Sequence, residues 1–229
     1  MASVTRSYRG ASAAERRARR RAALLAAGLE LLGTVGWAGT TVRGVCAQAG
    51  LNDRYFYESF ADLDALRLAV IDGLMADGTA AIVAATDTPR DLRERTRAVV
   101  TAIVDFFTAD PRRAHILVHE FGSSPLLAGR RRHLIQDLVG LFTAQVHELL
   151  GQVPVGDADV ELTALTLIGG GLELITTWLR GDLAVGRDHL IDFIVALMLT
   201  STDLSAALER EARAPVAGRE TRGYGAVKD

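Results

Sequence analysis

The sequence predicts an all-α protein, and three observations support that prediction. Aromatic residues make up only 6% of the 229 residues and prolines number five, so long helices meet few breaks. Apolar residues recur at helical spacing through most of the chain. The segment 40–60 has the plan of two short helices joined by a tight turn. We therefore expect about nine helices, a three-helix head followed by a helical body.

The first helix should begin at a capping box. Ser12 and Glu15 have the spacing at which each side chain can satisfy the other residue's backbone N–H. A leucine-rich stripe between Leu24 and Leu32 predicts its buried face, and the helix should end near Gly33–Gly36.

The same helix carries a dense basic cluster near its start. It consists of Arg16, Arg17, Arg19, Arg20 and Arg21. Such a run is ordinarily a solvated helix face. Because it directly precedes the segment 40–60, we favour contact with phosphate or the minor groove of DNA, above all for Arg16, Arg17 and Arg20.

The segment 40–60 predicts a helix-turn-helix. Thr41 is a good N-cap for a helix that begins at Val42, and Gly50 stands where a left-handed residue commonly ends a helix. Asn52 can cap the next helix. In this arrangement the first turn of the second helix reaches base edges, so the sequence predicts a DNA-binding head.

Three residues fill the first turn of that second helix. Arg54 could read guanine through two hydrogen bonds, and Asp53 could accept a hydrogen bond from cytosine. Tyr55 stands beside them, and Asn52 precedes them. Asp53 could equally stabilise the helix N-terminus or pair with an arginine.

Charge is divided unevenly along the chain, whose net charge is −2. Residues 1–60 carry nine Arg against four acidic residues, a net charge of +5, whereas the remaining residues carry a net charge of −7. A basic head on an acidic body is typical of a protein whose head alone contacts DNA. The one cysteine, Cys46, excludes an internal disulfide and should pack as a small apolar residue.

The body should contain six further helices. The first is long enough to connect head and body, and Pro111 is well suited to a first helical position. The expected ranges are about 61–85, 91–109, a helix through 115–121, 126–150, 157–180 and 187–210. The last two are apolar on more than one face and therefore need a second surface to cover them.

The chain resembles the TetR family of transcriptional regulators. The likeness rests on Gly36, Thr40-Thr41-Val42, Val45–Leu51, Phe56-Tyr57 and Phe60, and continues through Asp62, Ala65 and Leu66. Two positions depart from the family pattern: Ser59 replaces a common His and Leu63 a common Lys, both of which usually contact phosphate. This resemblance implies that the Tyr57 hydroxyl bonds phosphate, and the alternative is that its ring packs in the core of the motif. We expect Thr41 and Arg43 to contact the DNA backbone. Ser59 is included in the expected DNA-binding set.

The resemblance also implies a twofold dimer and a ligand cavity. The last two helices would pair with their copies, through Leu165, Ile168, Gly169, Leu172, Ile175, Ile194, Leu197 and Met198. A run of three glycines, 169–171, would be explained by close backbone approach, although a kink is the alternative. The cavity would lie in the body, with Phe106, His119, Glu120, Gln136 and Trp178 as candidate lining residues. An apolar cavity favours a lipophilic effector.

His115 and His119 have a spacing that could hold a metal, but no third ligand stands at an obvious spacing, so we expect packed or hydrogen-bonded histidines. The sequence has no phosphate loop, nucleophile elbow or convincing metal set, which disfavours an enzyme and predicts no cofactor.

The whole pattern predicts a soluble, cytoplasmic regulator, most simply a homodimeric repressor released from a palindromic operator by a small molecule. The expected domains are a DNA-binding domain at 1–60, a ligand-binding and dimerisation domain at 61–210, and a disordered tail at 211–229. A constitutive DNA-binding regulator without an effector and an all-helical interaction module are the alternatives.

Overall fold

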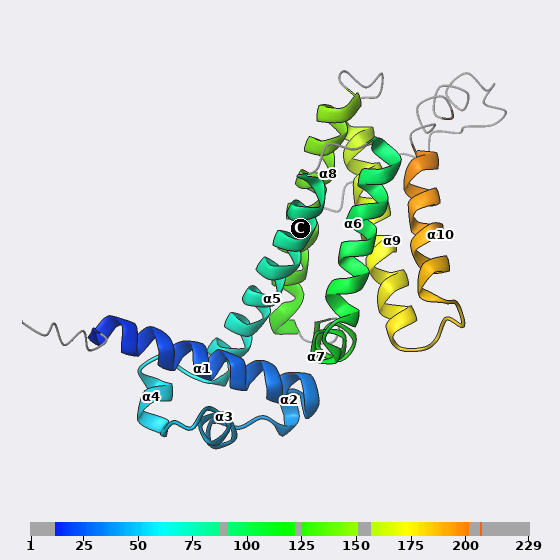
Figure 1. Cartoon of the computed structure of the whole chain (residues 1–229). Coiled ribbons are helices and arrows are strands. Elements are labelled where there is room, and N and C mark those ends of the chain that lie inside the picture. Colours follow the sequence, from blue (N-terminus) through cyan, green and yellow to red (C-terminus); the bar gives the residue numbers. More distant parts are fainter. Residues whose placement is uncertain (1–11, 88–90, 122–124, 151–156, 202–206, 208–229) are drawn as a thin grey trace, which may run out of the picture.

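The computed structural model describes residues 12–87, 91–121, 125–150, 157–201 and 207 (Figure 1). These residues form ten α-helices and one π-helical segment, and the described part of the chain contains no strand. This confirms the predicted all-α class. The expected loops at 88–90, 122–124 and 151–156, the extension of the last helix to 210 and the tail at 211–229 lie outside the described residues.

The head consists of α1 (Ala13–Thr34), α2 (Gly36–Gly39), α3 (Val42–Ala49) and α4 (Asp53–Tyr57). Ser12 caps α1 through the expected capping box, since its hydroxyl accepts from the Glu15 backbone at 3.1 Å and Glu15 accepts from the Ser12 backbone at 2.6 Å. The head core gathers buried side chains from α1, α3 and α4, among them Leu24, Val45 and Phe56. The single turn α2 is an element that the sequence did not predict.

Helix α5 (Leu63–Thr86) runs from the head into the body (Figure 1). It begins two residues later than expected because Asp62 is its N-cap and accepts a hydrogen bond from the Ala65 backbone at 2.7 Å. Its first half belongs to the head core through Leu66 and Val70. One continuous helix therefore links the two parts of the molecule.

The segment 111–121, expected to be one α-helix, has two helical forms. Helix α7 (Pro111–His115) begins with Pro111 in its first turn, as predicted, and passes directly into a π-helical segment, η1 (Ile116–Phe121). Buried Ile116, Leu117 and Phe121 anchor η1 in the same core as the head. The wider π turn was not predictable from apolar spacing at 3.6 residues per turn.

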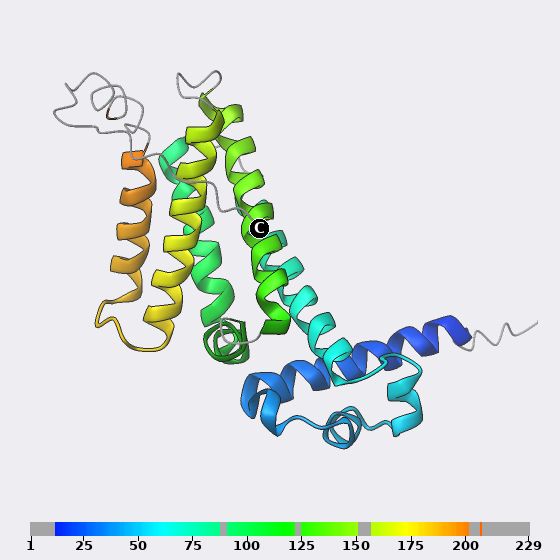
Figure 2. The same ribbon diagram turned by 180° about the vertical axis from the view of Figure 1, so that it is seen from behind.

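The body combines α5 with α6 (Leu92–Thr108), α8 (Pro125–Leu150), α9 (Asp157–Leu179) and α10 (Arg187–Thr200). These helices stand side by side, with α7 near the junction with the head (Figures 1 and 2). A second apolar core joins α6, α9 and α10 through Val104, Ile175 and Ile191. Leu63–Thr86 and Ala158–Leu179 are long and apolar enough to cross a membrane by length and composition alone, a weak criterion that core helices also meet.

Candidate DNA interface and ligand cavity

The turn between α3 and α4 is built from local hydrogen bonds. The Thr41 hydroxyl accepts from the Gly44 backbone at 3.0 Å, and the Asn52 side chain accepts from the Tyr55 backbone at 3.3 Å. Gly50 has φ +64°, a left-handed conformation that favours glycine, and the next N–H returns to the Cys46 carbonyl at 2.9 Å. These bonds set the angle at which α4 leaves the turn.

Helix α4 separates a buried face from an exposed one. Phe56 is fully buried, whereas the Arg54 side chain is 83% exposed and Tyr57 is 60% exposed. Arg54 Nε donates to Glu58 on the same helix at 3.1 Å. The two residues singled out for base reading and phosphate contact therefore both point away from the head core.

The other residues of the first turn face the protein more closely. Tyr55 is half-buried, and the Arg20 guanidinium lies 4.4 Å from its ring centroid. Asp53 is exposed but lies close enough to Cys46 to interact with its thiol. Burial chiefly, and the Asp53 carboxylate in addition, raise the pKa of the buried Cys46 thiol, as expected for a packed cysteine.

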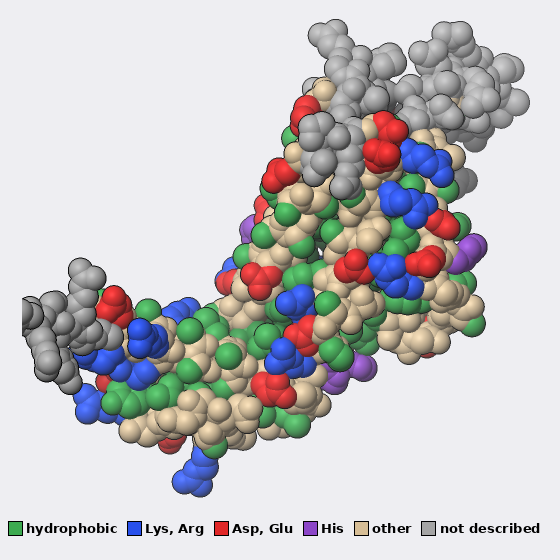
Figure 3. Space-filling model, viewed as in Figure 1, with side chains coloured by type: hydrophobic (Ala, Val, Ile, Leu, Met, Phe, Trp, Pro, Cys, Tyr) green, Lys and Arg blue, Asp and Glu red, His purple; other side chains and the backbone are tan. Residues whose placement is uncertain are grey.

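The arginine cluster of α1 divides into two groups. Arg16, Arg17 and Arg19 are exposed. Arg20 contacts both Tyr55 and Glu58, the latter at 3.6 Å. Arg21 covers the Phe60 ring at 4.3 Å and donates to the Ser59 carbonyl at 3.4 Å. Basic side chains are visible along α1 in the surface view (Figure 3). Arg20, expected to contact DNA, thus already has protein partners.

The remaining predicted DNA-contact positions lie at the two helix starts and after α4. Thr41, Arg43 and Asn52 are exposed, while Ser59 is half-buried. Leu63, at the other position where the chain departs from the family pattern, packs against the head core. Replacing a charged residue there with leucine therefore extends the apolar contact of α5.

Two polar networks join the head to the body. In the first, Glu120 of η1 accepts from Arg67 Nη2 at 2.9 Å and from the Trp37 backbone N–H at 3.0 Å. The Arg67 and Glu120 side chains are only 7% and 13% exposed. The Arg67 guanidinium also lies 4.8 Å from the Trp37 ring centroid. Glu120 therefore bonds both the start of α5 and the short helix α2.

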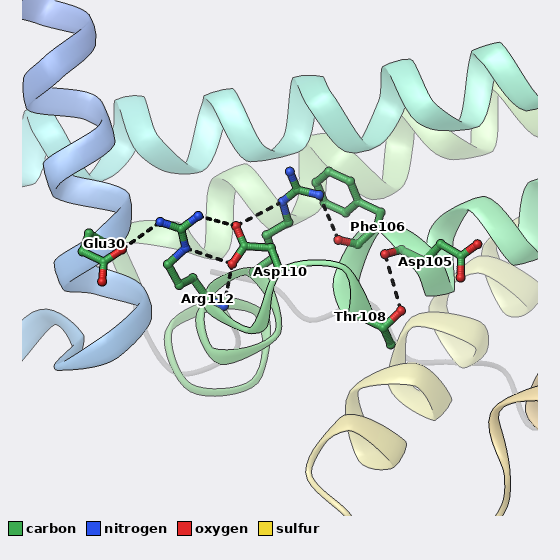
Figure 4. A network of polar contacts seen from close by, with 7 residues as sticks. Glu30, Asp105, Phe106, Thr108, Asp110 and Arg112 are labelled. Atoms are coloured by element: carbon green, nitrogen blue, oxygen red, sulfur yellow. Dashed lines mark hydrogen bonds and ion pairs between the residues drawn. The ribbon is translucent and has the colours of Figure 1, made fainter.

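In the second network, Arg112 of α7 connects to Glu30 of α1 (Figure 4). Arg112 donates to Glu30 at 2.8 Å and to both carboxylate oxygens of Asp110 at 2.9 and 2.7 Å. The hydrogen bond from Arg112 is the main cause that lowers the pKa of Asp110. The crossing is close, since a Cβ added at Gly33 would lie 2.3 Å from the Arg112 Cβ.

A partly open cavity of about 270 Å³ lies between α5, α6, α8, α9 and α10. Most of its wall is apolar, including Val99, Leu138 and Ile175. Its polar lining residues are Thr86, Arg95, Thr96, Gln145, Asp159, Thr163 and Ser201.

None of the five ligand-binding residues expected from the sequence lines this cavity. Phe106 packs under the Arg113 guanidinium at 4.3 Å, and Trp178 donates to the Val185 carbonyl at 2.9 Å. Glu120 is occupied at the head–body junction, and Gln136 is exposed. His119 is exposed, with its ring centroid 4.6 Å from that of His115. The expectation rested on side-chain type and coarse helix position, which do not report how the helices are rotated.

Arg95 and Gln145 line the cavity, although neither was predicted from the sequence. Arg95 lies one turn before Val99 on the apolar side of α6, and a charge within an apolar stripe is the signal that could have identified it. Gln145 lies 50 residues further along the chain, and its role emerges only from the packing of α8 against α6. Within the described residues, no group of three or more His, Cys, Asp or Glu side chains could hold a metal ion.

The residues expected at a dimer interface fall into two groups. Leu165 and Leu197 are 51% and 42% exposed. Ile175 and Ile194 are instead buried within the chain itself, and both line the cavity together with Ile168, Leu172 and Met198. Gly169 has open space where a Cβ would lie. The exposed apolar face of α9 and α10 consists of Leu162, Leu165, Phe193 and Leu197.

Comparison with known proteins finds a match to one protein family and to many solved structures. Residues 24–70 match the family described as "Bacterial regulatory proteins, tetR family". A search of curated proteins found no match. FadR from Bacillus halodurans is 17% identical with a TM-score of 0.68, over 79% of this chain and 94% of that one.

Two further structures are similar. A putative transcriptional regulator from Pseudomonas aeruginosa PAO1 is 24% identical with a TM-score of 0.64, over 86% of this chain and 95% of that one. FadR from Bacillus subtilis, solved in complex with stearoyl-CoA, is 17% identical with a TM-score of 0.63, over 77% and 96% of the two chains. At these identities the likeness shows the fold.

Proposed function

We propose that the chain is a DNA-binding transcriptional regulator of the TetR family, whose model matches residues 24–70, and that it acts as a cytoplasmic homodimeric repressor released from its operator by a small lipophilic molecule. The observation that carries this proposal is an exposed, capped α4 joined to a body with an apolar cavity. Protein interiors are normally close-packed, so a regulator without an effector should have a filled body. The cavity therefore favours ligand response over constitutive DNA binding. The stearoyl-CoA bound by the Bacillus subtilis FadR carries a lipophilic acyl chain.

We assign DNA contact to the N-terminal domain, residues 1–60, and ligand binding and dimerisation to residues 61–210. Arg54 reads a base, Tyr57 holds phosphate, and Thr41 and Arg43 contact the backbone at the start of α3. These side chains are all exposed, which is the condition for reaching a duplex.

The dimer contact proposed here is the exposed apolar face of α9 and α10. Its four large side chains are 62%, 51%, 51% and 42% exposed at Leu162, Leu165, Phe193 and Leu197. A second copy would remove them from water, and the open space beside Gly169 and Gly170 would admit a close helix. A twofold dimer would present two copies of α4 to a palindromic operator.

The test is binding to duplexes from the DNA that flanks the protein's own gene, followed by fluorescence anisotropy over a salt titration with competitor DNA. Arg54→Ala should alter the preferred sequence at about 1–3 kcal/mol of discrimination, whereas Tyr57→Phe should weaken all duplexes alike. Arg93→Ala removes an exposed arginine at the start of α6 and is the matched control.

Two results would count against the proposal. A steep salt dependence without sequence preference would retain the basic head but exclude the operator. If light scattering gives the molar mass of a monomer, and Leu165→Glu does not change that mass, the dimer contact is excluded. The same duplex assay with added lipophilic compounds tests release.

A further inference from the structure

The cavity in the body has a polar end and an apolar end. Its seven polar lining residues all come from the ends of α5, α8 and α10 or the beginnings of α6 and α9. These helix ends gather at the side of the body away from the head (Figure 1). Lining residues closer to the head, such as Ile103, Leu138 and Ile175, are apolar. A ligand that fills this space should therefore be amphipathic, with its polar group far from the head.

Arg95 is the distinctive group at the polar end. Its side chain is 12% exposed, and its Nη1 donates to Gln145 Oε1 at 2.7 Å. Its nearest acidic partner is Glu148, at 3.7 Å from Nη1 and itself 62% exposed. Its Nε is buried without a hydrogen-bond acceptor. A buried donor without an acceptor is unfavourable, and this one lies on a cavity wall.

The unpaired part of Arg95 has a defined shape. Nη1 is the nitrogen engaged by Gln145, whereas the buried Nε has no acceptor. Nε and Nη2 lie on the same edge of a guanidinium, and that edge offers two parallel N–H groups. Two parallel donors match the two oxygens of a carboxylate.

Asp159 lines the same end and would favour a cation instead. It stands in the first turn of α9, where the helix dipole already stabilises a carboxylate. It is also partly exposed, so water can solvate its charge. Neither a helix dipole nor water stabilises the buried Nε–H of Arg95. Arg95 therefore has the greater need of a ligand partner.

We propose that the cavity binds a carboxylic acid with an apolar chain, whose carboxylate pairs with the Nε–Nη2 edge of Arg95 and whose chain runs among Val99, Leu138 and Ile175 toward the head. This proposal rests on the proposed ligand-responsive function and names the chemical class of its effector. At about 270 Å³ the space lies just below the usual range of ligand pockets, about 300–1,000 Å³, which favours a medium-length chain.

Isothermal titration calorimetry on the full chain, with decanoate, decan-1-ol, decylamine and decanoyl-CoA as probes, tests the proposal. Decanoate should bind about tenfold or more tightly than decan-1-ol, because only the acid pairs with the guanidinium. Arg95→Met should abolish that preference. Arg95→Lys, which keeps the charge but not the paired donors, should retain part of it. Arg97→Met, on the exposed side of the same helix, should bind decanoate as the unaltered protein does.

Several outcomes would overturn the carboxylate assignment. The assignment is excluded if decan-1-ol binds as tightly as decanoate, if decylamine binds more tightly, or if decanoyl-CoA binds and decanoate does not. In each of these cases a ligand with an apolar chain still binds, so the proposed function stands. Failure of all four probes to bind to protein that binds operator would also overturn it. If the unaltered protein binds no operator, the proposed function is overturned, independently of Arg95.

Discussion

The buried contact between Arg67 and Glu120 should contribute strongly to stability, and Glu120→Ala is the substitution that measures it. The change removes the partner of a guanidinium that is only 7% exposed and the acceptor for the Trp37 N–H. Arg67 would then remain as a buried charge whose Nε already lacks an acceptor. The head would also lose its bond from α2 to η1.

The magnitude follows from burial. Removing one partner of a buried ion pair costs about 3–5 kcal/mol. The lost acceptor for the Trp37 N–H is included in that figure, because both bonds are made by the one Glu120 carboxylate and their costs do not simply add. Glu120→Gln, which keeps an acceptor but not the charge, should lose less. Asp192→Ala is the control, since the Arg97 and Asp192 side chains are 44% and 59% exposed and such pairs contribute about 0–1 kcal/mol.

Urea unfolding at one fixed protein concentration gives the free energies. The chain has two tryptophans, so a Trp178→Phe background makes fluorescence report Trp37 in the head, while circular dichroism reports all helices. A loss for Glu120→Ala no larger than that for Asp192→Ala would refute the reasoning. In that case the Arg67 guanidinium would be solvated or paired elsewhere once Glu120 is removed.

Three further predictions follow from local features. Gly33→Ala should destabilise the protein by about 1–3 kcal/mol in urea unfolding, because the new Cβ would meet α7, whereas Gly140→Ala, with open space around it, should be neutral or stabilising. The lowered pKa of Asp110 contributes stability above its unfolded pKa of about 3.9, and that contribution is lost as pH falls through the folded value. Asp110→Asn should therefore flatten the decrease in melting temperature below about pH 4, and an unchanged slope would contradict this. The buried Cys46 thiol, with its raised pKa, should react with iodoacetamide only as fast as the protein unfolds, and rapid labelling of native protein would contradict its burial.

The correct sequence predictions concern interactions between residues close along the chain. The capping box at Ser12, the cap at Thr41 and the left-handed Gly50 each depend on partners no more than five residues away. Apolar spacing likewise identified the side chains that bury themselves in the head. Such features follow from helix geometry alone, which is why the helix-turn-helix was visible without a structure.

By itself, the sequence determined most of the helices, several of their caps and the character of the head. Only the tertiary structure decided what Glu120 does, since its partners Trp37 and Arg67 lie 83 and 53 residues away. It also decided that Arg95 faces the cavity while Phe106, Gln136 and Trp178 do not. The physical reason is that a cavity between five helices depends on how each helix is rotated and how far it slides against its neighbours, and the apolar residues on several sides of these helices permit more than one such arrangement.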